Sequence, residues 1–191
     1  MGVDIYGKKD KWIGVKPEID WSKEHTRAAK DEFFKLLDEF EETNPGYYFR
    51  SNWWGWRPIH MLCEVAAEKH DLDIDFKHWG SNDGKGLDNQ TQCDELADAL
   101  EDILETDGGF EDDYDTLYMN LGSWTDQSGT FIPEEIRSKL DEELPLGKVT
   151  FTGIMLADTG TTVYYPSHAC DKRHVMNFIK FLRDCGGFTI W

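Results

Sequence analysis

Helical and β-prone patterns follow one another irregularly along this chain of 191 residues. Apolar side chains recur at the spacing of a buried helix face at 29–40, 93–104 and 175–182. Short β-prone runs lie between these segments and at both ends, without the regular strand–helix alternation of a doubly wound parallel sheet. We therefore expect an α+β fold, one compact domain over residues 1–191, with a mixed, mostly antiparallel sheet covered by about four to five helices.

Turn and capping residues predict where the elements begin. Two short runs, Asp4–Tyr6 and Trp12–Val15, predict a β-hairpin. Ser22 is the expected N-cap of a long first helix, Pro58 is expected in the first turn of the second, and Asp171 is expected to cap the last helix.

The region between residues 116 and 165 has mainly β-strand character. Residues 116–121 predict a strand, and the runs at 149–156 and 161–165 predict a hairpin around the turn Ala157–Gly160. A short helix is expected to open at Pro133.

Negative charge is concentrated in one block of the sequence. The chain has 38 Asp and Glu against 20 Lys and Arg, a formal charge of −18, which repels phosphate backbones and anionic lipids. No Lys or Arg occurs from Gly86 to Ile136, where all fifteen charged side chains are acidic. We therefore expect no direct nucleic-acid binding and no membrane binding.

Part of the acidic block has the pattern of an amphipathic helix between residues 88 and 106. Its polar stripe consists of Asp94, Asp98, Glu101 and Glu105. Like charges at this spacing cost a few tenths of a kcal/mol each, so helix stability does not explain the stripe. Three interpretations remain open: a solvated face, a cation site, or a mimic of nucleic-acid phosphates that binds the basic surface of a DNA- or RNA-binding partner.

A segment rich in aromatic residues, from 47 to 58, is the most unusual local feature. It contains Tyr48, Arg50, Trp53, Trp54, Trp56 and Arg57. Indole rings with arginines predict a site for a small planar anionic ligand, such as a nucleotide. The alternative is that the rings are core residues and the arginines pair with acidic groups. Because three Trp within four positions cannot all point the same way, at least one should lie near solvent.

Histidines suggest a weaker, catalytic alternative. His60 and Glu64 stand four residues apart on one helix face, a spacing that suits a metal ligand pair or an acid–base pair. His168 and His174 are possible further ligands for a metal-assisted hydrolase. The common signatures of phosphate-binding loops, dinucleotide sites, serine esterases and zinc proteases are absent, and we expect no cofactor and no metal.

Cysteine usage fits a reducing compartment. The four cysteines, Cys63, Cys93, Cys170 and Cys185, include no C-x-x-C pair. No leader-like segment opens the sequence, and no apolar run approaches the length of a membrane span. Free thiols in a cytoplasmic protein are the expectation.

Several segments are similar to a family, without an assigned activity, that bacteriophages and bacterial genomes encode. The similar segments are Met1–Gly7, Gly46–Arg50, Trp54–Pro58, Asn82–Asp88 and Phe181–Phe188. The resemblance implies a phage or prophage protein that acts in the bacterial cytoplasm. Small accessory proteins of this kind often counter host defences, by binding a defence protein or by sequestering its nucleotide signal.

Together these features favour a non-enzymatic binding protein over an enzyme. The expected ligand is either a small planar anion at the aromatic segment or a protein bound by the acidic face. The metal-assisted hydrolase and the nucleic-acid mimic remain alternatives, and a structural role in a virion has no sequence feature in its favour.

Overall fold

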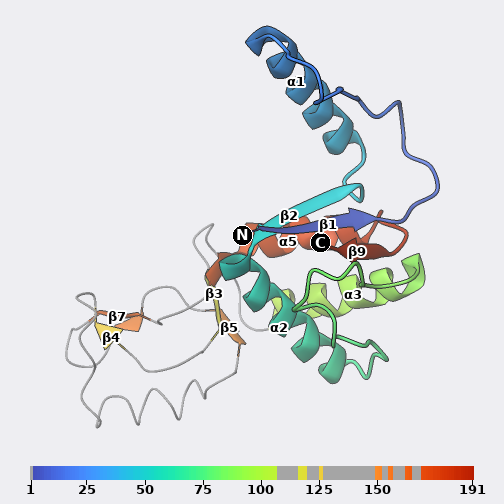
Figure 1. Cartoon of the computed structure of the whole chain (residues 1–191). Coiled ribbons are helices and arrows are strands. Elements are labelled where there is room, and N and C mark those ends of the chain that lie inside the picture. Colours follow the sequence, from blue (N-terminus) through green and yellow to red (C-terminus); the bar gives the residue numbers. More distant parts are fainter. Residues whose placement is uncertain are drawn as a thin grey trace.

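The computed structural model has an α+β architecture (Figure 1). The residues that it describes are 2–106, 116–119, 125–126, 149–151, 155–156, 162–164 and 169–191. The helices are α1 (Arg27–Thr43), α2 (Trp53–Lys69), α3 (Gln90–Thr106) and α5 (Lys172–Leu182). The main sheet has strands β1 (Gly2–Gly7), β2 (Tyr48–Asn52) and β9 (Phe188–Ile190) in the antiparallel order β2-β1-β9. The α+β prediction is confirmed.

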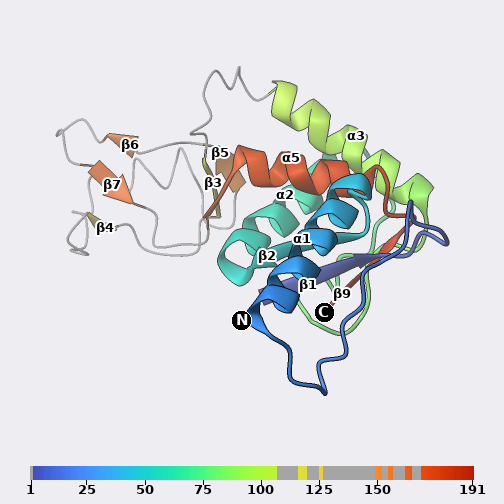
Figure 2. The same cartoon turned by 90° about the horizontal axis from the view of Figure 1, so that it is seen from above.

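The central strand β1 joins the two ends of the chain. Ile5 lies opposite Phe49 of β2 and Ile190 of β9, and Val3 and Ile5 are fully buried toward the helices. The helices α2, α3 and α5 lie on one side of this sheet, whereas α1 stands away on the other side (Figures 1 and 2). The core therefore forms between one face of the sheet and three helices.

The predicted hairpin at the start of the chain is wrong. β1 pairs with β2, not with Trp12–Val15, which has no strand structure. The buried side chain of Asn44 holds this loop instead: its Oδ1 accepts from Ile13 N (2.7 Å) and its Nδ2 donates to Ile13 O (2.9 Å). Backbone groups that a hairpin would have satisfied are thus bonded by a side chain.

The second helix begins earlier than predicted, at Trp53, so that Pro58 lies beyond its first turn. Asn52 is its N-cap, and the Asn52 Oδ1 accepts from Gly55 N at 2.8 Å. Pro58 consequently lies inside α2, where it cannot donate the hydrogen bond expected toward the carbonyl of Trp54. The tryptophan cluster is therefore part of a helix and does not connect a strand to a helix.

The first helix also begins at a different cap. Thr26 accepts from Ala29 N, whereas Ser22 donates both its backbone N–H and its hydroxyl to Asp20. Among the residues of α1, Phe40 alone is buried. This helix is amphipathic but has little of its apolar face against the body.

The predictions for α3 and α5 are confirmed. The apolar positions of α3 that the periodicity selected are buried, and Asp171 caps α5 by accepting from His174 N at 2.7 Å. Within the described ranges, no helix is both long and apolar enough to cross a bilayer.

Two further small sheets lie in the later part of the chain. The strands are β3 (Thr116–Met119), β4 (Thr125–Asp126), β5 (Val149–Phe151), β6 (Met155–Leu156), β7 (Thr162–Tyr164) and β8 (Ala169–Asp171). Their orders are β5-β3-β8 and β4-β7-β6. β6 and β7 form the predicted hairpin pairing, whereas β5 pairs with β3. The helix expected at Pro133 and the turn Ala157–Gly160 lie outside the described residues.

Candidate functional site

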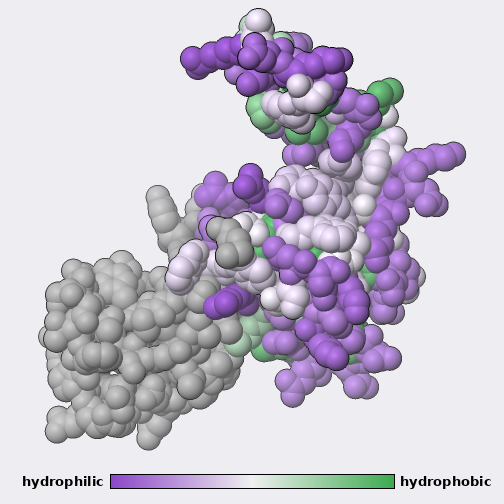
Figure 3. All heavy atoms as spheres, viewed as in Figure 1, coloured by the Kyte–Doolittle hydropathy of each residue, from purple (hydrophilic) through white to green (hydrophobic). Residues whose placement is uncertain are grey.

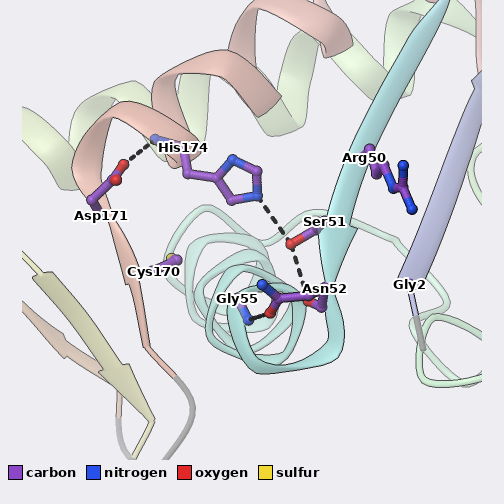
Figure 4. A pocket seen from close by; sticks show the side chains of 8 residues that line it. All are labelled: Gly2, Arg50, Ser51, Asn52, Gly55, Cys170, Asp171 and His174. Atoms are coloured by element: carbon purple, nitrogen blue, oxygen red, sulfur yellow. Dashed lines mark hydrogen bonds between the residues drawn. The ribbon is translucent and has the colours of Figure 1, made fainter.

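A cavity of about 680 Å³ lies where the first turns of α2 and α5 meet the edge of the main sheet. We call it the α2–α5 cavity (Figure 4). It is lined by Gly2, Arg50, Ser51, Asn52, Gly55, Cys170, Asp171 and His174. Its volume falls in the range of small-molecule sites.

Ser51 and His174 form a hydrogen-bonded pair in this cavity. The Ser51 Oγ lies 3.0 Å from the His174 Nε2, and the imidazole stacks on Phe49 with ring centroids 4.9 Å apart. Strand alternation in β2 places Ser51 on the same face as Phe49, and Ser51 is only 6% exposed. Burial lowers the pKa of His174, although Asp171 opposes this change. At neutral pH the imidazole is therefore uncharged. In one tautomer its Nε2 accepts the hydroxyl proton of Ser51; in the other it donates to the Ser51 Oγ, and the hydroxyl donates to Asn52 O at 3.1 Å.

The two helix ends at the cavity have different charges at their caps. A helix N-terminus carries a partial positive charge of roughly half a unit, which favours anions. α5 is capped by the carboxylate of Asp171, whereas α2 is capped by the neutral amide of Asn52. The α2 end is consequently the part of the cavity that favours an anionic ligand. At the α5 end the carboxylate of Asp171 already supplies a negative charge.

Arg50 carries a positive charge at the rim of the cavity, where its side chain projects from the face of β2 opposite Ser51 (Figure 4). Its side chain is mostly exposed, and its Nε lies 3.8 Å from the Asp4 Oδ1 on the neighbouring strand. The same carboxylate accepts a hydrogen bond from the Tyr48 hydroxyl. Asp4 thus fixes both side chains along the β1–β2 edge.

Glycine at position 55 keeps the cavity open. A Cβ on Gly55 would lie 3.1 Å from the Ser51 Oγ and 3.6 Å from the Cys170 Cβ. A larger side chain here would displace Ser51 or fill the cavity. The Cys170 thiol is not an activated nucleophile, because burial and the nearby Asp171 raise its pKa.

The predicted tryptophan site is not assembled. Trp56 is fully buried and donates its indole N–H to Trp79 O at 2.9 Å, Trp53 packs partly against the core, and Trp54 is 63% exposed. Successive helical residues point about 100° apart, so the three rings diverge. Trp54 confirms that at least one ring lies near solvent. The Arg57 guanidinium lies 5.9 Å from the centroid of the Trp53 ring.

Of the six residues predicted to bind a ligand, Arg50 alone lines the α2–α5 cavity. Tyr48 is held at the sheet by Asp4 and lies with its ring 5.1 Å from that of Tyr6. Burial, together with Asp4, raises the pKa of Tyr48, so its phenol stays protonated. Sequence reasoning missed Ser51 and considered His174 only as a possible metal ligand, because their partnership depends on a contact between residues far apart in the chain.

His60 lies in an aromatic cluster instead of a metal site. Its ring centroid lies 5.7 Å from that of Trp79 and 5.9 Å from that of Phe76, and its Nε2 is 3.5 Å from the Glu64 Oε1. Burial lowers the pKa of His60 to about 4. The described residues contain no group of three side chains suited to a metal, and His168 lies outside them.

The acidic stripe of α3 is largely engaged within the protein. Arg183 Nη2 lies 2.5 Å from the Asp98 Oδ1 and 2.6 Å from the Glu101 Oε2. Asp94 accepts from the Gln90 side chain at 2.7 Å, and Glu105 is exposed. Arg183 therefore offsets the like-charge repulsion along the helix, an intramolecular role for part of the stripe.

No protein-family model, curated protein or solved structure matches this chain. The fold and the α2–α5 cavity therefore carry the functional argument.

Proposed function

We propose that the protein binds a small anionic molecule, one that bears a carboxylate or a phosphate, in the α2–α5 cavity. The supporting observation is that the neutrally capped N-terminus of α2 and the residue Arg50 line the same cavity. The proposal retains the anionic character of the ligand that the sequence predicted. It does not include ring stacking on Trp53, Trp54 or Trp56, because none of these tryptophans lines the cavity.

The two ends of the cavity define the polarity of the ligand. Its acidic group lies at the α2 end near Arg50, where the helix dipole and the guanidinium both favour negative charge. The carboxylate of Asp171 at the other end is an acceptor for a hydroxyl or amino group of the ligand. Ser51 lies between these ends and offers its hydroxyl. Sequestration of a phage-related anionic signal is one use of such a cavity, and it rests on the family resemblance.

Ligand binding is tested with inorganic phosphate and adenosine monophosphate as probes in isothermal titration calorimetry. Asn52→Asp is the most informative variant, because aspartate keeps the cap on Gly55 N but adds a negative charge at the α2 end. Arg50→Gln removes the cation. Each variant should weaken binding at least about tenfold, the equivalent of about 1.4 kcal/mol.

Trp54→Ala is the matched control. Trp54 is exposed and does not line the cavity, so this variant should bind the probes as the wild type does. Absence of heat for both probes, or wild-type affinity of Asn52→Asp, would refute the proposal. Loss of binding in Trp54→Ala alone would favour the stacking site instead.

A second candidate function is hydrolysis of an ester, favoured by the 3.0 Å distance between the Ser51 Oγ and an uncharged His174. The hydroxyl oxygen attacks the acyl carbon while its proton passes to the imidazole Nε2 and then to the departing alkoxide. Water, activated by the same imidazole, hydrolyses the acyl-serine and regenerates the hydroxyl. A fluorophosphonate probe should add its phosphonyl mass to the wild type and not to Ser51→Ala. An unlabelled wild type that still binds phosphate would remove this candidate alone.

A further inference from the structure

The helix α1 lies apart from the body of the protein (Figures 1 and 2). In the part of the chain that the structure describes, none of the main contacts between helices and strands involves α1. The helix is attached at its C-terminal end, where Phe40 packs edge-on against Tyr47 with centroids 5.1 Å apart and Asn44 holds Ile13. The rest of α1 presents its surface to the surroundings.

Large apolar side chains are exposed on this arm, which comprises residues 13–43. Ten large apolar residues are exposed among the described residues, and half of them lie on the arm. They are Ile13, Val15, Trp21, Phe34 and Leu36. In Figure 3 a few green residues lie among white and purple ones on this part of the molecule. Exposed apolar side chains grouped on one projecting element are typical of a contact surface.

One stripe of α1 is complementary to itself. Lys30, Phe34, Leu37 and Glu41 are spaced by four, three and four residues, which places them on one helix face. The loop at 13–19 faces a different side of the helix, along Ala29, Leu36 and Phe40. Phe34 is 49% exposed and its ring lies 6.1 Å from that of Trp21.

We infer that α1 pairs with α1 of a second copy of this chain, antiparallel and about a two-fold axis. In that arrangement Lys30 of each copy lies opposite Glu41 of the other, and Phe34 lies opposite Leu37. The helix as a whole follows the same polarity: residues 27–35 carry a net charge of +1 and residues 36–43 a net charge of −4. Antiparallel pairing brings the basic half of each helix to the acidic half of its partner.

The position of the body also favours the antiparallel arrangement. The body joins α1 at the C-terminal end, and the helix of 17 residues is about 25 Å long. Antiparallel pairing therefore places the two bodies at opposite ends of the helix pair. A parallel pair would bring both bodies to the same end and would oppose the two acidic halves.

Two charge-reversed variants test the pairing by sedimentation equilibrium. Lys30→Glu and Glu41→Lys should each weaken the homodimer about tenfold, because two attractive contacts become repulsive in each case. Mixed in equal amounts, the two variants should form a heterodimer of wild-type stability, since every contact is again between opposite charges. Glu39→Lys is the matched control, because residue 39 lies on the opposite side of the helix from this stripe.

Each alternative result overturns the inference. A wild type that remains monomeric at about 0.1 mM has no such interface. Tighter association of Glu41→Lys alone indicates a parallel pair, and equal weakening by Glu39→Lys indicates a general charge effect. Leu37→Ser gives an independent check: it should abolish dimers while the far-ultraviolet circular dichroism of the monomer stays that of a folded protein.

Discussion

Acidification should destabilise this protein through His60, a titratable group held in an aromatic cluster. Desolvation lowers the pKa of His60 in the folded protein to about 4, against about 6.5 in an unfolded chain. The unfolded chain therefore binds more protons between these values. His60 lowers the stability progressively as the pH falls from 6.5 toward 4, and it leaves the stability unchanged above pH 7.

The size of this effect follows from the two pKa values. Proton linkage gives a loss of about 2 kcal/mol at pH 5 and about 3 kcal/mol at pH 4, relative to pH 7. His60 is largely buried and lies between Trp56, Phe76 and Trp79, so solvent screening reduces this figure little. For a domain of ordinary stability this is a large fraction of the free energy of unfolding.

Comparison with His60→Phe isolates the contribution of this one side chain. Phenylalanine has a similar size, fits among aromatic rings and does not titrate. Urea unfolding at pH 7, 6 and 5 should show the wild type losing about 2 kcal/mol more than the variant. Both proteins are compared in a Glu64→Gln background, which removes the carboxylate 3.5 Å from His60, so that the other carboxylates and His174 cancel in the difference. A difference that does not change with pH, or an NMR titration of His60 centred near its usual pKa, would refute the reasoning.

Two further predictions concern stability. Asn44→Ala should lower the free energy of unfolding by about 2 to 3 kcal/mol, measured by urea unfolding. The substitution removes three hydrogen bonds that the buried Asn44 side chain makes to Ile13 and Phe40. An effect under about 0.5 kcal/mol would contradict this prediction. Arg183→Met should lower the free energy of unfolding by about 1 kcal/mol at low salt, since it leaves Asp98 and Glu101 without their arginine on α3. About 0.5 M NaCl should reduce this loss of stability. A loss that does not depend on salt would indicate an effect on packing instead.

The helices were predictable where the signal is local. The buried face of α3, from Cys93 to Leu104, follows directly from hydrophobic periodicity, and Asp171 is the cap that the sequence indicates. The predicted cap of α1 was wrong because several residues can perform the same function within a few positions. Thr26 caps α1 while Ser22 bonds to Asp20.

The candidate site was predictable only in part. Arg50 was expected at a ligand site and does line the α2–α5 cavity. Trp56 was expected there and lies in the core, because the segment is helical and turns the ring inward. The pairing of Ser51 with His174 gives no signal in the sequence, since 123 positions separate them, and His174 was expected only as a possible metal ligand.

The amino-acid sequence by itself determined the α+β class, the buried stripes of α3 and α5, and the concentration of acidic charge. These properties depend on residues a few positions apart, whose spacing is independent of the rest of the fold. Tertiary structure alone decided the pairing of β1 with β2 and β9, the contact of Arg183 with the acidic stripe, and the meeting of Ser51 with His174. Such contacts depend on how distant elements pack, and their energies are balanced over the whole chain.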